Sequence, residues 1–201
     1  MQRVYVVDDD ELVRASLTLQ LQADYDVMCF AAARHFLDVA GSLPLGCLLL
    51  DVHMPEVDGL EVQRHLARRN LYFPTVMITG QGDVRIAVES MKAGAVDLVE
   101  KPFTREVIIE SLRLAQSRLA QPIAGHDGEE AAARLASLTE RERQVLCGLV
   151  AGLPNKTVAY DLGISQRTVE VHRSRIMTKT QARSFSGLVR LALAAGIEGR
   201  D

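Results

Sequence analysis

Acidic residues at the ends of two apolar runs form the pattern with the clearest chemical meaning. Asp8, Asp9 and Asp10 directly follow one apolar run, and Asp51 ends another. Carboxylates that lie close together repel one another, and a hard divalent cation is the usual way to stabilise them. Mg²⁺ favours one or two carboxylates together with waters and phosphate oxygens. If both runs end at the same place in the fold, these residues predict a magnesium site.

A hydroxyl and an ammonium group extend this pattern. Thr79 follows a third apolar run and Lys101 a fourth. With the carboxylates they would supply the parts of a phosphoryl-transfer site: an acceptor carboxylate, a metal ion, a hydrogen-bond donor and a cation. The simpler alternative is that residues 8–11 only cap a helix, where acidic side chains favour the positive end of the helix dipole. Thr79 and Lys101 weigh against helix capping as the whole explanation.

The elements that must position these side chains follow from the apolar periodicity of residues 1–121. Short apolar runs alternate with helical segments, and an uninterrupted run such as Leu48–Leu50 is typical of a strand buried on both faces of a parallel sheet. Five strands alternating with five helices predict an α/β fold with a doubly wound five-stranded parallel sheet. Functional groups in such sheets gather beyond the carboxyl ends of the strands, where both acidic runs lie. The predicted strands are Arg3–Val7, Asp26–Cys29, Cys47–Asp51, Thr75–Ile78 and Val96–Val99.

The rest of the chain has helical patterns and no strand pattern. Residues 122–136 contain one proline and two glycines and are interpreted as a linker, although a helix could begin at about residue 129. Residues 137–201 predict an all-α domain of four helices, the first with a capping box of Thr139 and Glu142. The second helix starts after Pro154, and the third runs from Gln166 to about Lys179. Two helices joined by a short glycine-containing turn are typical of a helix-turn-helix.

The formal charge changes sign along the chain. The 201 residues carry a net charge of -3, which taken alone argues against a nucleic-acid partner. Residues 1–121 hold 12 basic and 17 acidic residues, a net -5, and residues 122–136 hold 1 and 3, a net -2. Residues 137–201 hold 10 basic and 6 acidic residues, a net +4. The near-neutral total therefore averages an acidic part that suits a metal site and a basic part that suits nucleic acid.

Simple counts exclude other classes of protein. No run approaches the roughly 18 consecutive apolar residues of a membrane helix, and the first residues lack the apolar region of a signal peptide. Cys29, Cys47 and Cys147 form no CxxC pair, which suits small buried thiols in a reducing compartment. We therefore expect a cytoplasmic protein with no membrane partner.

The segments around the acidic runs resemble the receiver domain of two-component response regulators. The matching motifs, in register over residues 1 to about 118, are Val6–Asp10, Leu50–Pro55, Ile78–Gly80 and Glu100–Phe103. The resemblance implies a flavodoxin-like fold in which Asp51 accepts a phosphoryl group from a sensor histidine kinase. It implies no enzymatic activity beyond slow self-dephosphorylation.

The resemblance also assigns roles to single residues. The implied Mg²⁺ site consists of Asp8 acting through water, Asp9, Asp51 and the backbone carbonyl of His53. Lys101 would contact the phosphoryl group, Thr79 would respond to it, and Gly80 would leave space for it. The peptide bond before Pro102 is expected to be cis.

Two positions depart from the commonest receiver pattern and leave alternatives open. Leu98 stands three residues before Lys101, where an aromatic switch residue is usual. This keeps open a DNA-binding protein that is independent of phosphorylation and whose receiver is only a dimerisation module. His53 stands two residues after Asp51, where aspartyl phosphatases usually carry a second Asp, so a Mg²⁺-dependent phosphatase is a weaker alternative.

The second half of the chain resembles the LuxR-type helix-turn-helix. The matching segments are Leu138–Leu146, Pro154–Lys156 and Arg167–Arg173, and with the receiver they make the whole chain similar to FixJ-family regulators. Such proteins place one face of a helix in the major groove of DNA. The outward face consists of Arg167, Glu170, Val171 and Ser174, of which the last three would read bases. The implied phosphate contacts are Lys156, Arg173, Arg175 and Lys179.

The residues and the resemblance together predict a transcription regulator switched by phosphorylation of Asp51. Its expected partners are a sensor histidine kinase, double-stranded promoter DNA, RNA polymerase and, once phosphorylated, a second copy of the same chain.

Overall fold

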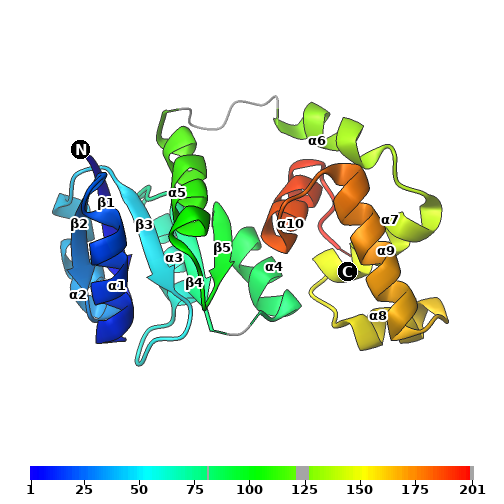
Figure 1. The fold of residues 1–201 in the computed structure, drawn as a ribbon, viewed down its shortest axis with the longest axis horizontal. Coiled ribbons are helices and arrows are strands. Elements are labelled where there is room, and N and C mark those ends of the chain that lie inside the picture. Colours follow the sequence, from blue (N-terminus) through cyan, green and yellow to red (C-terminus); the bar gives the residue numbers. More distant parts are fainter. Residues whose placement is uncertain (81, 121–126, 200–201) are drawn as a thin grey trace. The chain divides into compact units, whose positions relative to one another are not determined.

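Two compact units make up the described part of the chain (Figure 1). The computed structural model describes residues 1–80, 82–120 and 127–199. The first unit holds a sheet with helices on both faces, and every described element of the second unit is a helix. Residues 122–126 of the predicted linker lie outside the described residues.

The sheet of the first unit confirms the predicted fold. Its five parallel strands lie in the order β2-β1-β3-β4-β5, and each differs from its predicted bounds by at most one residue at either end. The strands are β1 (Gln2–Val7), β2 (Tyr25–Phe30), β3 (Cys47–Asp51), β4 (Thr75–Thr79) and β5 (Asp97–Glu100). The helices of this unit are α1 (Glu11–Leu21), α2 (Ala33–Val39), α3 (Gly59–Arg68) and α5 (Arg105–Ala120), with a short 3-10 helix, η1 (Ala40–Ser42).

Alternation along the strands explains how the sheet is covered on both faces. Val4 and Val6 of β1 belong to a core that includes residues of α1 and α5. Tyr5 lies between them in sequence and packs instead against the ring of Phe36 in α2, with ring centres 6.1 Å apart. Because successive side chains of a strand point to opposite faces, a continuous apolar run can bury both sides of the sheet.

The helices of the second unit are α4 (Val84–Lys92), α6 (Asp127–Leu135), α7 (Glu140–Val150), α8 (Asn155–Leu162), α9 (Gln166–Thr180) and α10 (Phe185–Ala194). Capping residues that the sequence analysis identified bound several of them. The predicted capping box of Thr139 and Glu142 is present at the start of α7. Ser165 accepts the backbone N–H of Thr168 and caps α9. Gly163 ends α8 with φ 64°, a left-handed conformation that costs a glycine no strain.

Two helices give the second unit more than the four that the sequence predicts. α6 lies within the predicted linker, yet its Ala131 and Leu135 are buried, and Leu135 belongs to the main core of this unit. α4 connects β4 to β5 within predicted domain 1–121, but it groups with the second unit. Helical periodicity predicts that the apolar face of a helix is buried, but it does not show which other element packs against that face. The boundaries at 121 and 137 stay a prediction.

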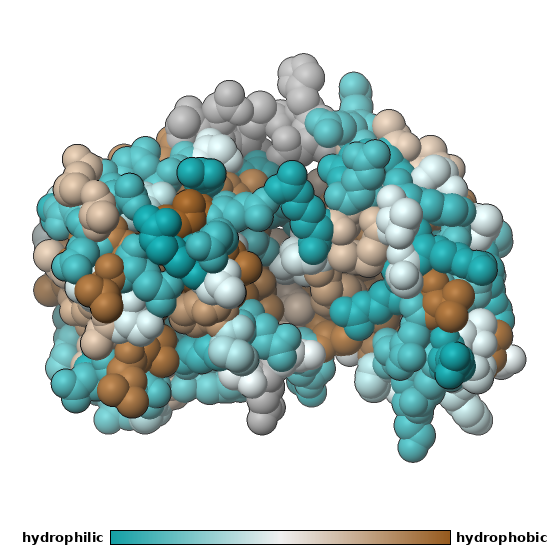
Figure 2. Space-filling model, viewed as in Figure 1, coloured by the Kyte–Doolittle hydropathy of each residue, from teal (hydrophilic) through white to brown (hydrophobic). Residues whose placement is uncertain are grey.

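The surface is polar where the cores are apolar. Figure 2 shows hydrophilic side chains over much of the face in view, with hydrophobic residues in scattered groups. Most large apolar side chains instead fill the cores of the two units. Within the described ranges, none of the helices combines the length and the apolar composition needed to cross a membrane.

Candidate functional site

The pairing of the strands brings the predicted phosphoryl-site residues to one edge of the sheet. Val7, the last residue of β1, pairs with Leu50 of β3, so the residues that follow them, Asp8 and Asp51, lie next to each other. β4 and β5 pair so that Lys101 comes directly after the residue opposite Thr79. Because parallel strands end on the same side, these groups of different chemistry converge.

Lys101 joins two of the carboxylates. Its Nζ donates to Oδ2 of Asp8 at 2.8 Å and to Oδ1 of Asp51 at 2.6 Å. Asp8 is 1% exposed and Asp51 is 4% exposed, and carboxylates so far out of water need such partners. Burial raises the pKa of Asp51 and the charge of Asp8 adds to this effect, against the hydrogen bond from Lys101. Burial works to lower the pKa of Lys101, but its hydrogen bonds to both carboxylates raise the pKa overall.

The acidic run after β1 divides between two roles. Asp10 is the N-cap of α1, and its Oδ1 accepts the N–H of Leu12 at 2.8 Å. Asp8 turns toward Lys101, while its Oδ1 accepts the N–H of Asp10 at 2.9 Å. Helix capping therefore explains the role of Asp10, whereas the side chain of Asp8 belongs to the group of residues at the edge of the sheet.

A hollow opens beside the two buried carboxylates. Gly80 adjoins open space, since a Cβ added to it would meet nothing within 4 Å. Thr79 is fully buried, and its carbonyl oxygen accepts the N–H of Lys101 at 2.7 Å. The peptide bond between Lys101 and Pro102 is cis, as the resemblance implies. The residues that line the hollow are Asp9, Asp10, Asp51, His53, Gly80 and Lys101.

The donor set of this hollow suits a hard divalent cation. No group of three or more His, Cys, Asp or Glu side chains in the described ranges is already arranged around one metal position, and Asp8 is engaged by Lys101. Mg²⁺ needs only one or two carboxylates beside waters. Asp9 and Asp51, with the backbone carbonyl of His53, could provide those ligands. A divalent cation would also favour the ionised form of Asp51, whose pKa is raised by burial and by the charge of Asp8.

Two residues at this edge were not singled out from the sequence. A Cβ on Gly59, the first residue of α3, would lie 2.4 Å from the carbonyl oxygen of Asp51, so glycine alone fits there. The Asp-Gly pair that ends the preceding loop was the available signal. Arg14 of α1 donates hydrogen bonds to the carbonyl oxygens of Asp8 and Asp9. No sequence pattern shows that an arginine in a helix reaches back to the loop before it.

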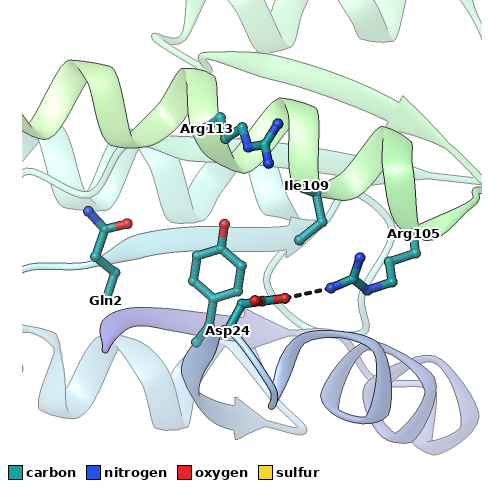
Figure 3. A pocket seen from close by; sticks show the side chains of 6 residues that line it. Gln2, Asp24, Arg105, Ile109 and Arg113 are labelled. Carbon is teal, nitrogen blue, oxygen red and sulfur yellow. Dashed lines mark hydrogen bonds and ion pairs between the residues drawn. The ribbon is translucent and has the colours of Figure 1, made fainter.

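A second hollow of the first unit shares none of these residues (Figure 3). The Arg105 side chain points toward Asp24 and forms an ion pair with it. The acidic side chain of this hollow is thus already matched by an arginine, so the hollow lacks the excess negative charge of the first. The residues that line it are Gln2, Asp24, Tyr25, Arg105, Ile109 and Arg113.

The predicted DNA-reading face lies on α9 and is exposed. Val169 and Ile176 anchor the opposite face of this helix in the core of the second unit. Val171 is 43% exposed although it is apolar, and Lys156 is exposed at the start of α8. The exposed residues predicted on α9 are Arg167, Glu170, Val171, Ser174, Arg175 and Lys179.

Two of the predicted phosphate contacts have partners within the protein. The guanidinium of Arg173 lies 4.4 Å from the centre of the Phe185 ring, and burial lowers its pKa. Lys179 donates to Oε2 of Glu142 at 2.6 Å. This hydrogen bond, followed by one from the backbone of Thr139, lowers the pKa of Glu142 to about 2. Both basic side chains therefore help to hold the second unit together.

Known proteins match this chain over both units. The family model described as response regulator receiver domain matches residues 4–113. The model described as bacterial regulatory proteins, luxR family, matches residues 136–192. The transcriptional regulatory protein FixJ of Rhizobium meliloti (strain 1021) is 49% identical over 195 residues, covering 96% of this chain and 96% of that protein. The chain belongs to the FixJ-like response regulators.

Further relatives of this response regulator match it over most of its length. The response regulator protein TmoT of Ectopseudomonas mendocina is 41% identical, covering 94% of this chain and 86% of that protein. The crystal structure of full-length FixJ from B. japonicum is 45% identical, with a TM-score of 0.58, and covers 97% of each chain. The response regulator StyR is 37% identical, with a TM-score of 0.56, and the match covers 96% of this chain and 98% of that one. The response regulator described here thus combines a receiver fold with a LuxR-type helical unit.

Proposed function

We propose that this response regulator is activated when a sensor histidine kinase phosphorylates Asp51 and that it then controls transcription. The observation that carries the proposal is the hydrogen-bonded group of Asp8, Asp51 and Lys101 at one edge of a receiver sheet, in a chain that continues into a helix-turn-helix. The proposed domains are a receiver at residues 1–121, a linker at 122–136 and a DNA-binding domain at 137–201.

Asp51 is the proposed phosphoacceptor. One of its carboxylate oxygens forms a bond to phosphorus while the bond from phosphorus to the donor's leaving group breaks. Mg²⁺ bound by Asp9, Asp51 and the carbonyl of His53 would neutralise charge on the phosphoryl oxygens. Lys101 already donates to Asp51 and is placed to contact the new phosphoryl group. The added charge of about -1.5 to -2 favours movement of Thr79 and Lys101 toward it.

The proposed DNA contacts lie on α8 and α9. Glu170, Val171 and Ser174 would read base edges, since Glu accepts hydrogen bonds from cytosine and Val contacts the thymine methyl group. The basic side chains would contact phosphates and fix the register of the helix on DNA. These are Lys156, Arg173, Arg175 and Lys179, and Arg167 is a further proposed DNA contact on the outward face of α9. We further propose that the phosphorylated chain forms a homodimer, contacts RNA polymerase and acts in the cytoplasm.

The proposed function is tested by phosphorylation of the full chain with Mg²⁺ and a small acyl phosphate donor. The wild-type chain should gain the mass of one phosphoryl group, and Asp51→Asn should gain none. Phosphorylated protein should then form more dimer and bind more tightly to DNA selected from a pool of random sites. Asp38→Asn removes an exposed carboxylate of α2 and serves as the matched control. A chain that takes up no phosphoryl group at Asp51 would overturn the proposal.

A second candidate function rests on Leu98, which occupies the usual position of the aromatic switch residue. In that case the chain binds DNA regardless of phosphorylation, and the receiver serves only for dimerisation. Equal DNA affinity of phosphorylated and unphosphorylated protein in the same experiment would favour it. A Mg²⁺-dependent phosphatase would instead show sustained hydrolysis of a small phosphate ester. Exposed His53, rather than a second carboxylate, follows Asp51 by two residues and speaks against that activity.

A further inference from the structure

We propose that Arg14 is a positioning residue for the metal-binding loop, fixing the backbone of Asp8 and Asp9 so that the Asp9 carboxylate is ready to bind Mg²⁺. The inference rests on the proposed function in that it concerns the same metal site. It adds a residue from the body of α1 to which neither the sequence patterns nor the resemblance assigns a role.

The contact is specific in its atoms. A single nitrogen, Nη1 of Arg14, donates to the carbonyl oxygen of Asp8 at 2.8 Å and to that of Asp9 at 2.8 Å. Arg14 is only partly exposed, so the guanidinium is not a freely moving surface group. Both carbonyls precede the N-cap Asp10 and lie outside the reach of the helix's own N–H groups. Two successive carbonyls on one donor nitrogen hold the peptide between them in one orientation.

Asp9 depends on this contact more than its neighbours do. The side chain of Asp8 is held by Lys101 and by the N–H of Asp10, and the side chain of Asp10 is held as the N-cap of α1. In the described part of the chain, the exposed carboxylate of Asp9 has no hydrogen bond from another group. Its position is therefore set by its backbone, and Arg14 is the side chain that binds this backbone.

The charge of Arg14 acts in the same direction. Its guanidinium lies against the loop that carries three consecutive aspartates. A cation placed there offsets part of the repulsion that would push the loop apart before the metal ion binds. Groups that orient metal ligands without touching the metal commonly change metal affinity by 10- to 100-fold when they are removed. An arginine that only stabilised α1 would change the stability of the unit and leave metal affinity unchanged.

The test compares four full-length proteins: wild type, Arg14→Met, Arg14→Lys and the control Arg64→Met. Met keeps the length of the side chain but donates nothing, Lys keeps a cationic donor, and Arg64 is an exposed arginine of α3. Mg²⁺ affinity is measured by calorimetry without any phosphodonor. Hydrogen exchange of the Asp10 and Leu12 amides is measured in metal-free protein, because these amides report on the loop directly.

Arg14→Met should bind Mg²⁺ about 10-fold more weakly than wild type, and Arg14→Lys should recover part of that loss. The amides of Asp10 and Leu12 should exchange faster in Arg14→Met, and Arg64→Met should match wild type in both measurements. If Arg14→Met does not fold, Arg14→Gln takes its place, because its amide is too short to reach both carbonyls. Wild-type Mg²⁺ affinity in a folded Arg14→Met or Arg14→Gln would overturn the inference, even if that variant melts earlier.

Failure of this inference is distinguishable from failure of the proposed function. If Mg²⁺ binding depends on Arg14 but Asp51 takes up no phosphoryl group, the positioning role stands and the phosphoacceptor role falls. The opposite result is that wild type and Arg14→Met are both phosphorylated at Asp51 and need the same Mg²⁺ concentration for half-maximal rate. In that case the positioning role falls and the proposed function stands.

Discussion

At the scale of single residues, the ammonium group of Lys101 serves two buried carboxylates at once. Asp8 and Asp51 compete for it, so neither carboxylate is fully compensated. Burial raises the pKa of Asp51 first of all, and the charge of Asp8 adds to the shift. A carboxylate held in this way gains from every further positive charge that approaches it, which is a suitable starting point for a metal-assisted nucleophile.

The raised pKa of Asp51 predicts how this carboxyl titrates before the metal ion binds. In metal-free protein its midpoint should lie above the ordinary value of 3.8, and below that midpoint the protonated carboxyl is not a nucleophile. Asp8→Asn removes a repelling charge and leaves Lys101 to Asp51, so the midpoint should move to lower pH. NMR titration of the Asp51 carboxyl in metal-free protein checks this, with Asp38→Asn as control. A midpoint unchanged by Asp8→Asn contradicts the argument.

The close packing at Gly59 predicts that a larger side chain there would displace Asp51. Gly59→Ala places a Cβ where the carbonyl oxygen of Asp51 lies 2.4 Å away, so the loop after β3 must shift. We expect the unfolding free energy of Gly59→Ala to be about 1–3 kcal/mol lower than that of wild type. Phosphorylation should also be slower, because Asp51 moves. Gly41→Ala is the matched control, since its added Cβ meets nothing within 4 Å. Denaturant unfolding and phosphorylation rates measure both effects, and equal behaviour of the two variants would refute the prediction.

The lowered pKa of Glu142 predicts that the second unit becomes less stable in acid. Its pKa is lowered from 4.5 to about 2, chiefly by Lys179, so the folded state favours the ionised form. The stability that it contributes is present above pH 4.5 and is lost as pH falls toward 2. Glu142→Gln should be less stable at neutral pH by about 2 kcal/mol and should lose less stability over this range. Unfolding followed by circular dichroism measures this, with the exposed Glu130→Gln as control.

At the scale of elements, α6 is tied to the end of the helix that is proposed to read DNA. The guanidinium of Arg134 donates through Nε to the carbonyl oxygen of Thr180 at 2.9 Å and makes a second bond to it through Nη2. Thr180 is the last residue of α9, where carbonyls lack partners within the helix and a cation is favourable. A segment with the composition of a linker thus supplies a C-terminal cap to a helix 46 residues further along the chain.

The packing of α6 predicts where an independently stable second domain begins. A fragment that starts at residue 127 keeps Ala131, Arg134 and Leu135, whereas one that starts at residue 137 loses them. We expect the shorter fragment to be less stable by about 2–4 kcal/mol, because the core loses buried apolar side chains and α9 loses its cap. Chemical unfolding of both fragments measures the difference. Equal stability would mean that α6 contributes nothing to the core of the unit.

At the scale of the whole molecule, charge is divided between an acidic first part and a basic second part. Residues 1–121 have a net charge of -5 and residues 137–201 a net +4, from the counts of 12 against 17 and 10 against 6 basic and acidic residues. Association with DNA should therefore weaken as salt is added, because phosphate contacts release counterions. The basic residues divide further into those that are free for DNA and those with a partner in the protein.

This division predicts different effects for two lysines. Lys156→Ala should reduce the slope of log affinity against log salt by about 1 and leave the melting temperature unchanged, since Lys156 is exposed. Lys179→Ala should lower the melting temperature, because it leaves the buried Glu142 without its ammonium partner. Binding titrations at several salt concentrations and thermal melts separate the two effects, with Arg34→Ala as control. A stability loss in Lys156→Ala or none in Lys179→Ala would contradict this assignment.

The strands, several helix caps and the residue types that meet at the candidate site could be predicted from the sequence. Strand ends carrying Asp8, Asp51 and Lys101 could be identified because parallel strands finish on one edge whatever their order in the sheet. The capping residues could be identified because a cap acts within three or four residues of its own position, as Thr139 does with Glu142. These features depend on local spacing, which a sequence shows directly.

Contacts between residues that lie far apart in the chain could not be predicted from the sequence. Lys101 bridges Asp8 and Asp51, Lys179 pairs with Glu142 rather than standing free, and Arg134 caps α9 from within the predicted linker. Arg14 and Gly59 lie close in sequence to the residues that they contact, but no sequence pattern showed these contacts either. Such partners depend on the path of the backbone between them. An amphipathic pattern records that a side chain is covered or charged, but not which residue it contacts.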